Sequence, residues 1–275
     1  MQRLILIYVC GRTFAAREVA RGAFDAKYKK FVLKKYERYY RIGTLYPFED
    51  GFPHLQEFLD DAEKLDIDCR ITTDVYFTPA EIRKLPFYQM LLRVPFELQG
   101  TTPEEYGTQY TEEHCSHCKY GGKLKGDLLV DRKFMRNCKI GSFYSHNFVK
   151  EEIIPILESN GLTGLSYTGN VRDYKGREMP SFKLFEPNHI LPPYSKTTCL
   201  KKSSFPCQYC GYTMTYFYGP PEYERKKLEG ALDFNWSYEI CNNYMERELI
   251  VSAKVKEVFK ANKIFAYFRP IVILD

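Results

Sequence analysis

The chain has 275 residues, of which 44% are hydrophobic and 27% are charged, and its formal net charge is +5 at pH 7. This composition is that of a folded globular protein and excludes a disordered chain. The charge is less concentrated than in a dedicated nucleic-acid-binding protein, and no apolar stretch reaches the roughly 18 residues that a membrane span needs. Nine cysteines, an odd number, favour a reducing, cytoplasmic location over a secreted disulfide framework.

The N-terminal segment begins with a predicted strand and a predicted helix. The apolar run at residues 4–10 predicts a β-strand rather than a signal peptide, because the run is short and arginines follow it directly. Residues 24–43 carry aromatic side chains at three- and four-residue steps, which is typical of an amphipathic helix. The basic face of this helix, residues 28–41, indicates either a solvated surface or a contact with the phosphates and bases of a nucleic acid.

A second helix is predicted over residues 54–67, and a strand over residues 69–77. Thr78 then fits the N-cap of a further helix, since a proline occupies the first helical position and Glu81 stands at the capping-box position. We expect this helix to end near Lys84, because a proline follows two residues later.

Residues 98–112 are rich in Gly, Thr, Pro and Glu and form the best candidate for a domain boundary. We therefore expect two domains. Residues 1–105 would form an N-terminal α/β region, and residues 106–275 a C-terminal domain.

The C-terminal domain shows signs of an internal duplication. Residues 149–171 align without a gap with residues 251–273, which lie 102 positions later. Each copy predicts a helix, then an asparagine suited to a left-handed cap (Asn160 and Asn262), then an apolar strand. The sequence thus predicts a mixed α+β fold whose C-terminal region contains a duplicated helix-strand unit.

The strongest local signal is a pair of CxxC motifs. Cys115 and Cys118 recur 92 positions later as Cys207 and Cys210. Two such turns can supply the four thiolates that Zn²⁺ binds in a tetrahedron. We expect one zinc ion per chain that clasps the two halves of the domain. The ion would be structural, because four protein ligands leave no open position for a substrate.

Other interpretations of the four cysteines remain open. An iron-sulfur cluster also accepts four thiolates, a CxxC motif can be a redox site, and the thiols could be unrelated. His114 and His117 are the nearest further candidate ligands, and we expect both at the surface. The chain contains no phosphate-binding loop, no nucleophile elbow and no HExxH motif, so the sequence indicates a protein that is not an enzyme.

Several segments of the C-terminal domain resemble the bacterial double-CxxCG proteins, which are grouped with immunity proteins of polymorphic toxin systems. The resembling segments are "YGTQYTEEHCSHCKYGG", "EEIIPILESNGLTGLSYTGNV", "PCQYCG", "LDFNWSYEI" and "ELIVSAKVKEVFKANKIFAYFRPIVI". The resemblance implies that Cys115, Cys118, Cys207 and Cys210 are metal ligands. One departure is Lys119, which stands where the second motif has Gly211.

The resemblance also implies a function. Members of this family are expected to be cytoplasmic proteins that bind one cognate bacterial toxin and neutralise it by non-covalent inhibition. The alternative hypothesis is a zinc-stabilised module that binds nucleic acid through the basic aromatic helix 28–41, and a third is a redox protein that uses either CxxC motif.

Overall fold

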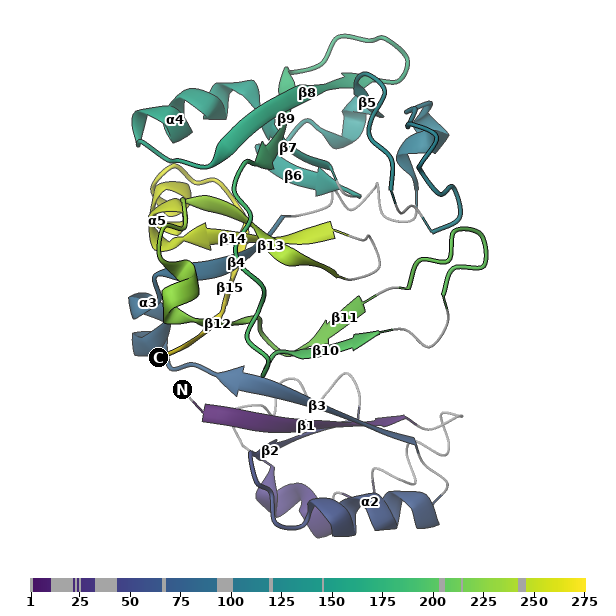
Figure 1. The fold of residues 1–275 in the computed structure, drawn as a ribbon, viewed down its shortest axis with the longest axis vertical. Coiled ribbons are helices and arrows are strands. Elements are labelled where there is room, and N and C mark those ends of the chain that lie inside the picture. Colours follow the sequence, from purple (N-terminus) through teal and green to yellow (C-terminus); the bar gives the residue numbers. More distant parts are fainter. Residues whose placement is uncertain are drawn as a thin grey trace. The chain divides into compact units, whose positions relative to one another are not determined.

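The computed structural model describes most of the chain, namely residues 2–10, 22, 24, 26–32, 44–65, 68–92, 101–118, 121–144, 146–202, 206–213, 215–241 and 246–275. Within these residues the fold is mixed, with many strands and few helices, so the predicted α+β class is confirmed (Figure 1). The chain divides into two compact units. Unit 1 comprises residues 1–83 and 218–220, and unit 2 comprises residues 84–217 and 221–275.

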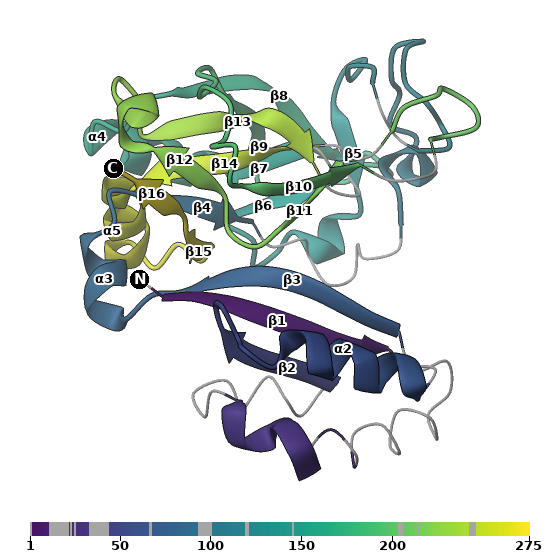
Figure 2. The same ribbon diagram turned by 60° about the horizontal axis from the view of Figure 1, so that its bottom comes forward.

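Unit 1 is built on an antiparallel sheet in the order β2-β1-β3. Its strands are β1 (Gln2–Cys10), β2 (Thr44–Glu49) and β3 (Asp68–Tyr76). Helix α2 (Leu55–Lys64) runs along one face of the sheet (Figure 2). The strand predicted at residues 4–10, the helix predicted at 54–67 and the strand predicted at 69–77 are thus confirmed.

Aromatic side chains make up most of the core of unit 1 among the described residues. Phe24 and Tyr28, from the segment predicted as an amphipathic helix, are both buried and pack against Phe58 of α2. Residues 26–28 are helical and continue into the 3₁₀ turn η1 (Lys29–Phe31). The rest of that predicted helix, residues 33–43, lies outside the described residues.

Helix α3 (Pro79–Lys84) begins with the predicted capping box. The Glu81 backbone N–H donates to Thr78 Oγ1 at 3.2 Å, and the Thr78 N–H donates to Glu81 Oε2 at 2.8 Å. The helix ends at Lys84, as the following proline predicts. The backbone N–H groups of Thr78 and Glu81 are therefore both bonded to side chains.

Unit 2 contains a first sheet in the order β6-β7-β9-β8-β5. Neighbouring strands are antiparallel except β5 and β8, which are parallel. Helix α4 (Ile154–Ser159), preceded by the 3₁₀ turn η7 (Glu151–Ile153), connects β7 to β8. The strands are β5 (Leu128–Val130), β6 (Ile140–Phe143), β7 (His146–Lys150), β8 (Leu165–Asp173) and β9 (Phe182–Pro187).

The second sheet of unit 2 has the order β13-β14-β4-β15, and all its neighbouring strands are antiparallel. Strand β15 leads directly into β16, which pairs in parallel with β12. Helix α5 (Ala253–Ala261) connects β14 to β15. The strands are β4 (Phe87–Leu91), β12 (Glu222–Glu224), β13 (Phe234–Cys241), β14 (Glu246–Ser252), β15 (Tyr267–Pro270) and β16 (Val272–Leu274).

Strand β4 explains where the units divide. It lies inside the second sheet, with β14 on one side and β15 on the other, so residues 84–105 belong to unit 2. The boundary expected after residue 105 falls within this unit instead. Local composition reports the irregular segment that follows β4, but it contains no information on the distant strands with which β4 pairs.

The two connecting helices end in a similar way, which differs in one detail from the expected cap. Asn160 and Asn262 each donate a side-chain hydrogen bond to a carbonyl four residues earlier, at 2.8 and 2.9 Å. Their own φ angles are −84° and −98°, so neither asparagine is left-handed. The residues that follow, Gly161 at φ +59° and Lys263 at φ +52°, make the left-handed turn.

Both helices are also shorter than the aligned segments suggest. Residues 149–150 and 251–252 are the last residues of β7 and β14, and the helical turns begin after them.

Among the described residues, every helix is too short or too polar to cross a lipid bilayer.

Candidate metal centre

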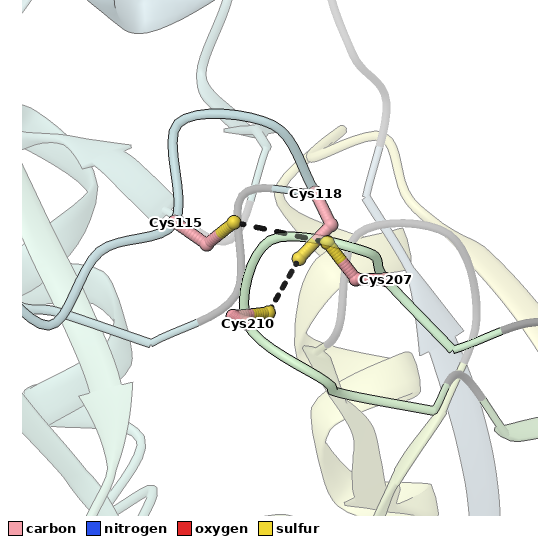
Figure 3. Close-up of side chains that lie close together, drawn as sticks. All are labelled: Cys115, Cys118, Cys207 and Cys210. Atoms are coloured by element: carbon pink, nitrogen blue, oxygen red, sulfur yellow. Dashed lines mark hydrogen bonds between the residues drawn. The ribbon is translucent and has the colours of Figure 1, made fainter.

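Four cysteine sulfurs from two distant parts of unit 2 lie together. The Sγ atoms of Cys115, Cys118, Cys207 and Cys210 are all within 4.8 Å of one another (Figure 3). The Sγ atoms of Cys115 and Cys207 are 3.9 Å apart, and those of Cys118 and Cys210 are 3.4 Å apart. Each of these two contacts joins one CxxC motif to the other.

The first CxxC motif lies at the tip of a short hairpin, which we call the first knuckle (residues 109–125). The Thr111 N–H donates to the Lys123 carbonyl at 2.9 Å, and the Lys125 N–H donates to the Gln109 carbonyl at 2.8 Å. These bonds bring the two arms of the hairpin together below the cysteines. Lys119, the departure from the family pattern, lies outside the described residues.

Two adjacent glycines allow the first knuckle to close. Gly121 and Gly122 both have φ +75°, a conformation that other residues adopt at a cost. A Cβ atom on Gly122 would lie 2.5 Å from the Cβ atom of His114, and one on Gly121 would lie 2.6 Å from the Glu113 carbonyl oxygen. The returning arm therefore passes too close to the outgoing arm for any larger residue at these two positions.

The second CxxC motif forms a tighter turn, which we call the second knuckle (residues 206–212). The Gly211 N–H donates to the Cys207 carbonyl, and the Cys207 N–H donates to the Tyr212 carbonyl, both at 2.8 Å. Gly211 has φ +73°, as expected for a glycine directly after the second cysteine. Strands β10 (Cys199–Lys202) and β11 (Thr215–Tyr218), which pair with each other, flank this knuckle.

Backbone N–H groups favour the thiolate form of the first cysteine in each motif. The N–H of Cys118 points at the Cys115 sulfur and lowers the pKa of Cys115 to about 6. The N–H of Cys210 likewise lowers the pKa of Cys207. Because the thiolate is the form that binds metals, both knuckles are prepared for ligation by their own backbones.

The histidines next to the motifs lie in different surroundings. His114 was expected at the surface, but its side chain is only 10% exposed. Its Nδ1 lies 3.0 Å from the Gly121 carbonyl oxygen and its Nε2 lies 3.0 Å from Glu104 Oε1, so both nitrogens are engaged. His117 is exposed as expected, and its ring packs against the ring of Tyr209 at a centroid distance of 4.5 Å.

Two further cysteine side chains of unit 2, those of Cys138 and Cys241, lie apart from this cluster. Cys138 is half-buried, and its thiol faces the Ile140 carbonyl oxygen at 3.3 Å. Cys241 is buried, and burial raises its pKa to about 12. Among the described residues, the two CxxC motifs supply the one group of three or more histidine, cysteine or acidic side chains arranged to hold a metal ion.

The geometry of the sulfurs suits an ion more than a disulfide. A tetrahedron with metal-sulfur bonds of about 2.3 Å has sulfur-sulfur edges of about 3.8 Å. The two sulfur-sulfur distances of 3.4 and 3.9 Å lie on either side of that edge length, and both are far longer than the roughly 2.05 Å of a disulfide bond. The arrangement can therefore bind one metal ion with four thiolates.

The basic helix of the alternative hypothesis is only partly described. Within unit 1, Lys27 lies 2.7 Å from Glu57 and 2.6 Å from Asp61, both on α2, and Asp61 also accepts a hydrogen bond from Tyr28. The Lys27 ammonium lowers the pKa of Asp61 to about 2. Lys27, directly before the basic segment, is thus paired within the unit, whereas residues 33–41 of that segment lie outside the described residues.

The fold and the cysteine cluster together define an α+β protein with a site that can hold a metal ion. Comparison with models of protein families finds no match to this chain, and comparison with curated proteins finds none either.

Proposed function

We propose that unit 2 is an internally duplicated domain. Support comes from the two sheets, which follow one path: β6-β7-β9-β8 in the first and β13-β14-β4-β15 in the second, with antiparallel neighbours throughout. Strand β8, which follows α4, pairs in parallel with the short strand β5, and β16, which directly follows β15, pairs in parallel with the short strand β12. One CxxC motif precedes each of these short strands in the chain.

The duplication extends further along the chain than the sequence alignment indicated. Strand β4 comes before the first knuckle but completes the second sheet, whereas β9 comes before the second knuckle but completes the first sheet. Each half of unit 2 thus gives its first strand to the sheet of the other half. Such an exchange makes the two halves depend on each other for folding.

We further propose that the cysteine cluster holds one Zn²⁺ ion as a structural clasp between the halves. Zinc favours four thiolates in a tetrahedron, and a site filled by four protein ligands leaves no position for a reacting water. A redox role is disfavoured, because a redox CxxC motif works with its own two sulfurs alone, whereas here the sulfurs of both motifs lie within 4.8 Å of one another.

Metal analysis of the purified full-length chain tests the clasp. The expected result is one zinc per chain, with no visible absorption of an iron-sulfur cluster. Recovery of iron and sulfide would replace zinc with a cluster, and a metal-free chain with a stable unit 2 would refute the clasp.

The function that we propose is that of an immunity protein, which binds a cognate bacterial toxin and blocks it without chemistry. The observation that carries this proposal is the convergence of the four cysteines, because they are the ligands that the resemblance to the double-CxxCG proteins implies. The five segments quoted above for the resemblance also belong to unit 2. A rigid clasp would suit a preformed binding surface, since preorganisation reduces the entropy lost on binding.

A tagged pull-down from the source cells, with a high-salt wash, tests this function. A single polypeptide with a toxin domain, recovered in near-equal amount, is the expected result, and co-expression should then abolish its toxicity. Nucleic acid that is lost in the wash, without a protein partner, would instead favour the nucleic-acid-binding hypothesis.

A further inference from the structure

The side chain of His114, directly before the first cysteine, joins three segments around the first knuckle. Its Nδ1 faces the carbonyl oxygen of Gly121 on the returning arm, and its Nε2 faces Glu104 Oε1, each at 3.0 Å. Glu104 belongs to the 3₁₀ turn η5 (Pro103–Tyr106). That turn is itself fixed, because the Thr102 N–H donates to Glu105 Oε1 at 3.1 Å.

The face of the His114 ring also has a packing partner. It stacks on the ring of Tyr110 at a centroid distance of 4.0 Å and an interplanar angle of 12°. The Tyr110 hydroxyl lies 2.8 Å from Nε2 of His146, a residue of β7. Burial lowers the pKa of His146 to about 4, so the neutral imidazole can accept a hydrogen bond from the Tyr110 hydroxyl at Nε2. Through Tyr110, the base of the first knuckle is tied to the first sheet.

The described residues of the second knuckle, 206–212, include no histidine. The residue that corresponds to His114, 92 positions later, is Pro206, which has neither an imidazole nor a backbone N–H. The flanking strands β10 and β11 and the short Cys207–Tyr212 turn shape that knuckle instead. The first knuckle spans a longer return, through Gly121 and Gly122, and the His114 side chain makes a contact across it.

We propose that His114 is a positioning residue for the metal centre: with Glu104 and Tyr110 it holds the first knuckle in the shape that presents Cys115 and Cys118 to the second. This inference rests on the metal site proposed above. His114 does not bind the ion, because both its nitrogens already face oxygen atoms. Its role corresponds to that of the outer groups that orient the ligands of other metal sites.

The test compares the zinc affinity of matched variants of the full-length chain, measured by competition with a chromophoric chelator. His114→Phe keeps an aromatic ring for the stack on Tyr110 but removes both hydrogen bonds. We expect zinc to bind about 10- to 100-fold more weakly, the range found when outer partners of a metal site are removed. His117→Phe is the control, because it makes the same change on the exposed side of the same knuckle and should leave the affinity unchanged.

A second readout separates positioning from general damage. At saturating Co²⁺ the His114→Phe chain should show the same thiolate-to-metal absorption as the wild type, since the four ligands are intact, and its far-UV circular dichroism should match that of the wild type. If His114→Phe does not fold, Glu104→Gln carries the same expectation of weaker binding while leaving the ring in place.

Unchanged affinity in both His114→Phe and Glu104→Gln would overturn the proposal. So would an equal loss in His117→Phe. A wild-type chain that binds neither zinc nor cobalt would refute the metal centre itself, which is a different outcome from a metal centre indifferent to His114.

Discussion

The two sheets of unit 2 follow the same path but hold it with different side chains. The first knuckle is fixed by His114 and a pair of glycines, whereas the second is fixed by a short turn and the single Gly211. Asp173 is the last residue of β8, and its side chain is fully buried, whereas the aligned Asp275 follows β16 and is 89% exposed. Shared backbone topology and shared cysteines are thus compatible with local interactions that have little in common.

The largest expected effect tests the feature that the two halves share. Cys210→Ser removes one of four thiolates, so metal affinity should fall by more than the roughly 100-fold that the loss of an outer partner costs. Because metal binding stabilises only the folded state, the melting temperature of the zinc-loaded chain should fall as well. Metal content and thermal unfolding measure the two effects.

Cys138→Ser is the control for this prediction. It makes the same substitution at a half-buried thiol outside the cluster. It should leave one metal ion per chain, and equal losses in the two variants would show that the cluster is not a metal site.

The next prediction asks whether the halves fold together. Leu157 of α4 and Phe259 of α5 occupy aligned positions, and both are buried. Replacing either by alanine should reduce the free energy of unfolding by about 2–5 kcal/mol through lost burial and the cavity left behind. Because the proposed halves exchange β4 and β9, both variants should shift the same transition of unit 2 in chemical denaturation. Two transitions, each moved by only one variant, would contradict the exchange of β4 and β9.

This comparison also separates what the sequence can predict from what it cannot. Patterns within about ten residues were sufficient to predict β1, α2, β3 and the Thr78 cap. They were also sufficient to identify each CxxC motif. The partners of β4 were not predictable, because alternation of apolar residues identifies a buried face but not the strand beside it. His114 was expected at the surface for a similar reason: its partner Glu104 lies in a separate turn, and only the folded hairpin brings them together.

The missed features nevertheless left signals in the sequence. The double glycine at residues 121 and 122 indicated a close approach of two backbones, which the structure places at His114. The proline before β4 recurs before β9, in "LPFYQML" and "MPSFKLF", a similarity that would extend the proposed duplication back to residue 85. Both signals are short, and each became interpretable only once its spatial partner was known.

A smaller effect is expected at Asp173, the last residue of β8. Asp173 accepts hydrogen bonds from the side chain of Arg177 and from the backbone N–H groups of residues 132, 175 and 177. The Arg177 guanidinium, followed by those N–H groups, holds the pKa of Asp173 well below its usual range. Asp173→Asn should therefore reduce the free energy of unfolding at pH 7 by about 2–3 kcal/mol.

The pH dependence of this effect has a definite sign. A carboxyl group with a lowered pKa stabilises the folded state fully above its ordinary pKa of about 4, and that contribution is lost as the pH falls below this value. The wild type should thus lose more stability than Asp173→Asn between about pH 4 and pH 2, in urea titrations at each pH. Asp275→Asn removes an exposed pair with Arg225 and should change little. Equal losses in the two variants would remove this difference between the sheets.

The smallest effects are expected at the left-handed residues that follow the two helices, and they should have opposite signs. Gly161 at φ +59° adopts its conformation without steric cost, whereas Lys263 at φ +52° places a Cβ atom close to a carbonyl oxygen. Gly161→Ala should therefore reduce the free energy of unfolding by about 1 kcal/mol. Lys263→Gly should increase it by about 0.5 kcal/mol, because relief of the left-handed strain exceeds the added freedom of glycine in the unfolded chain. Denaturant midpoints that move in the same direction for both variants would mean that the two helix ends are not equivalent turns.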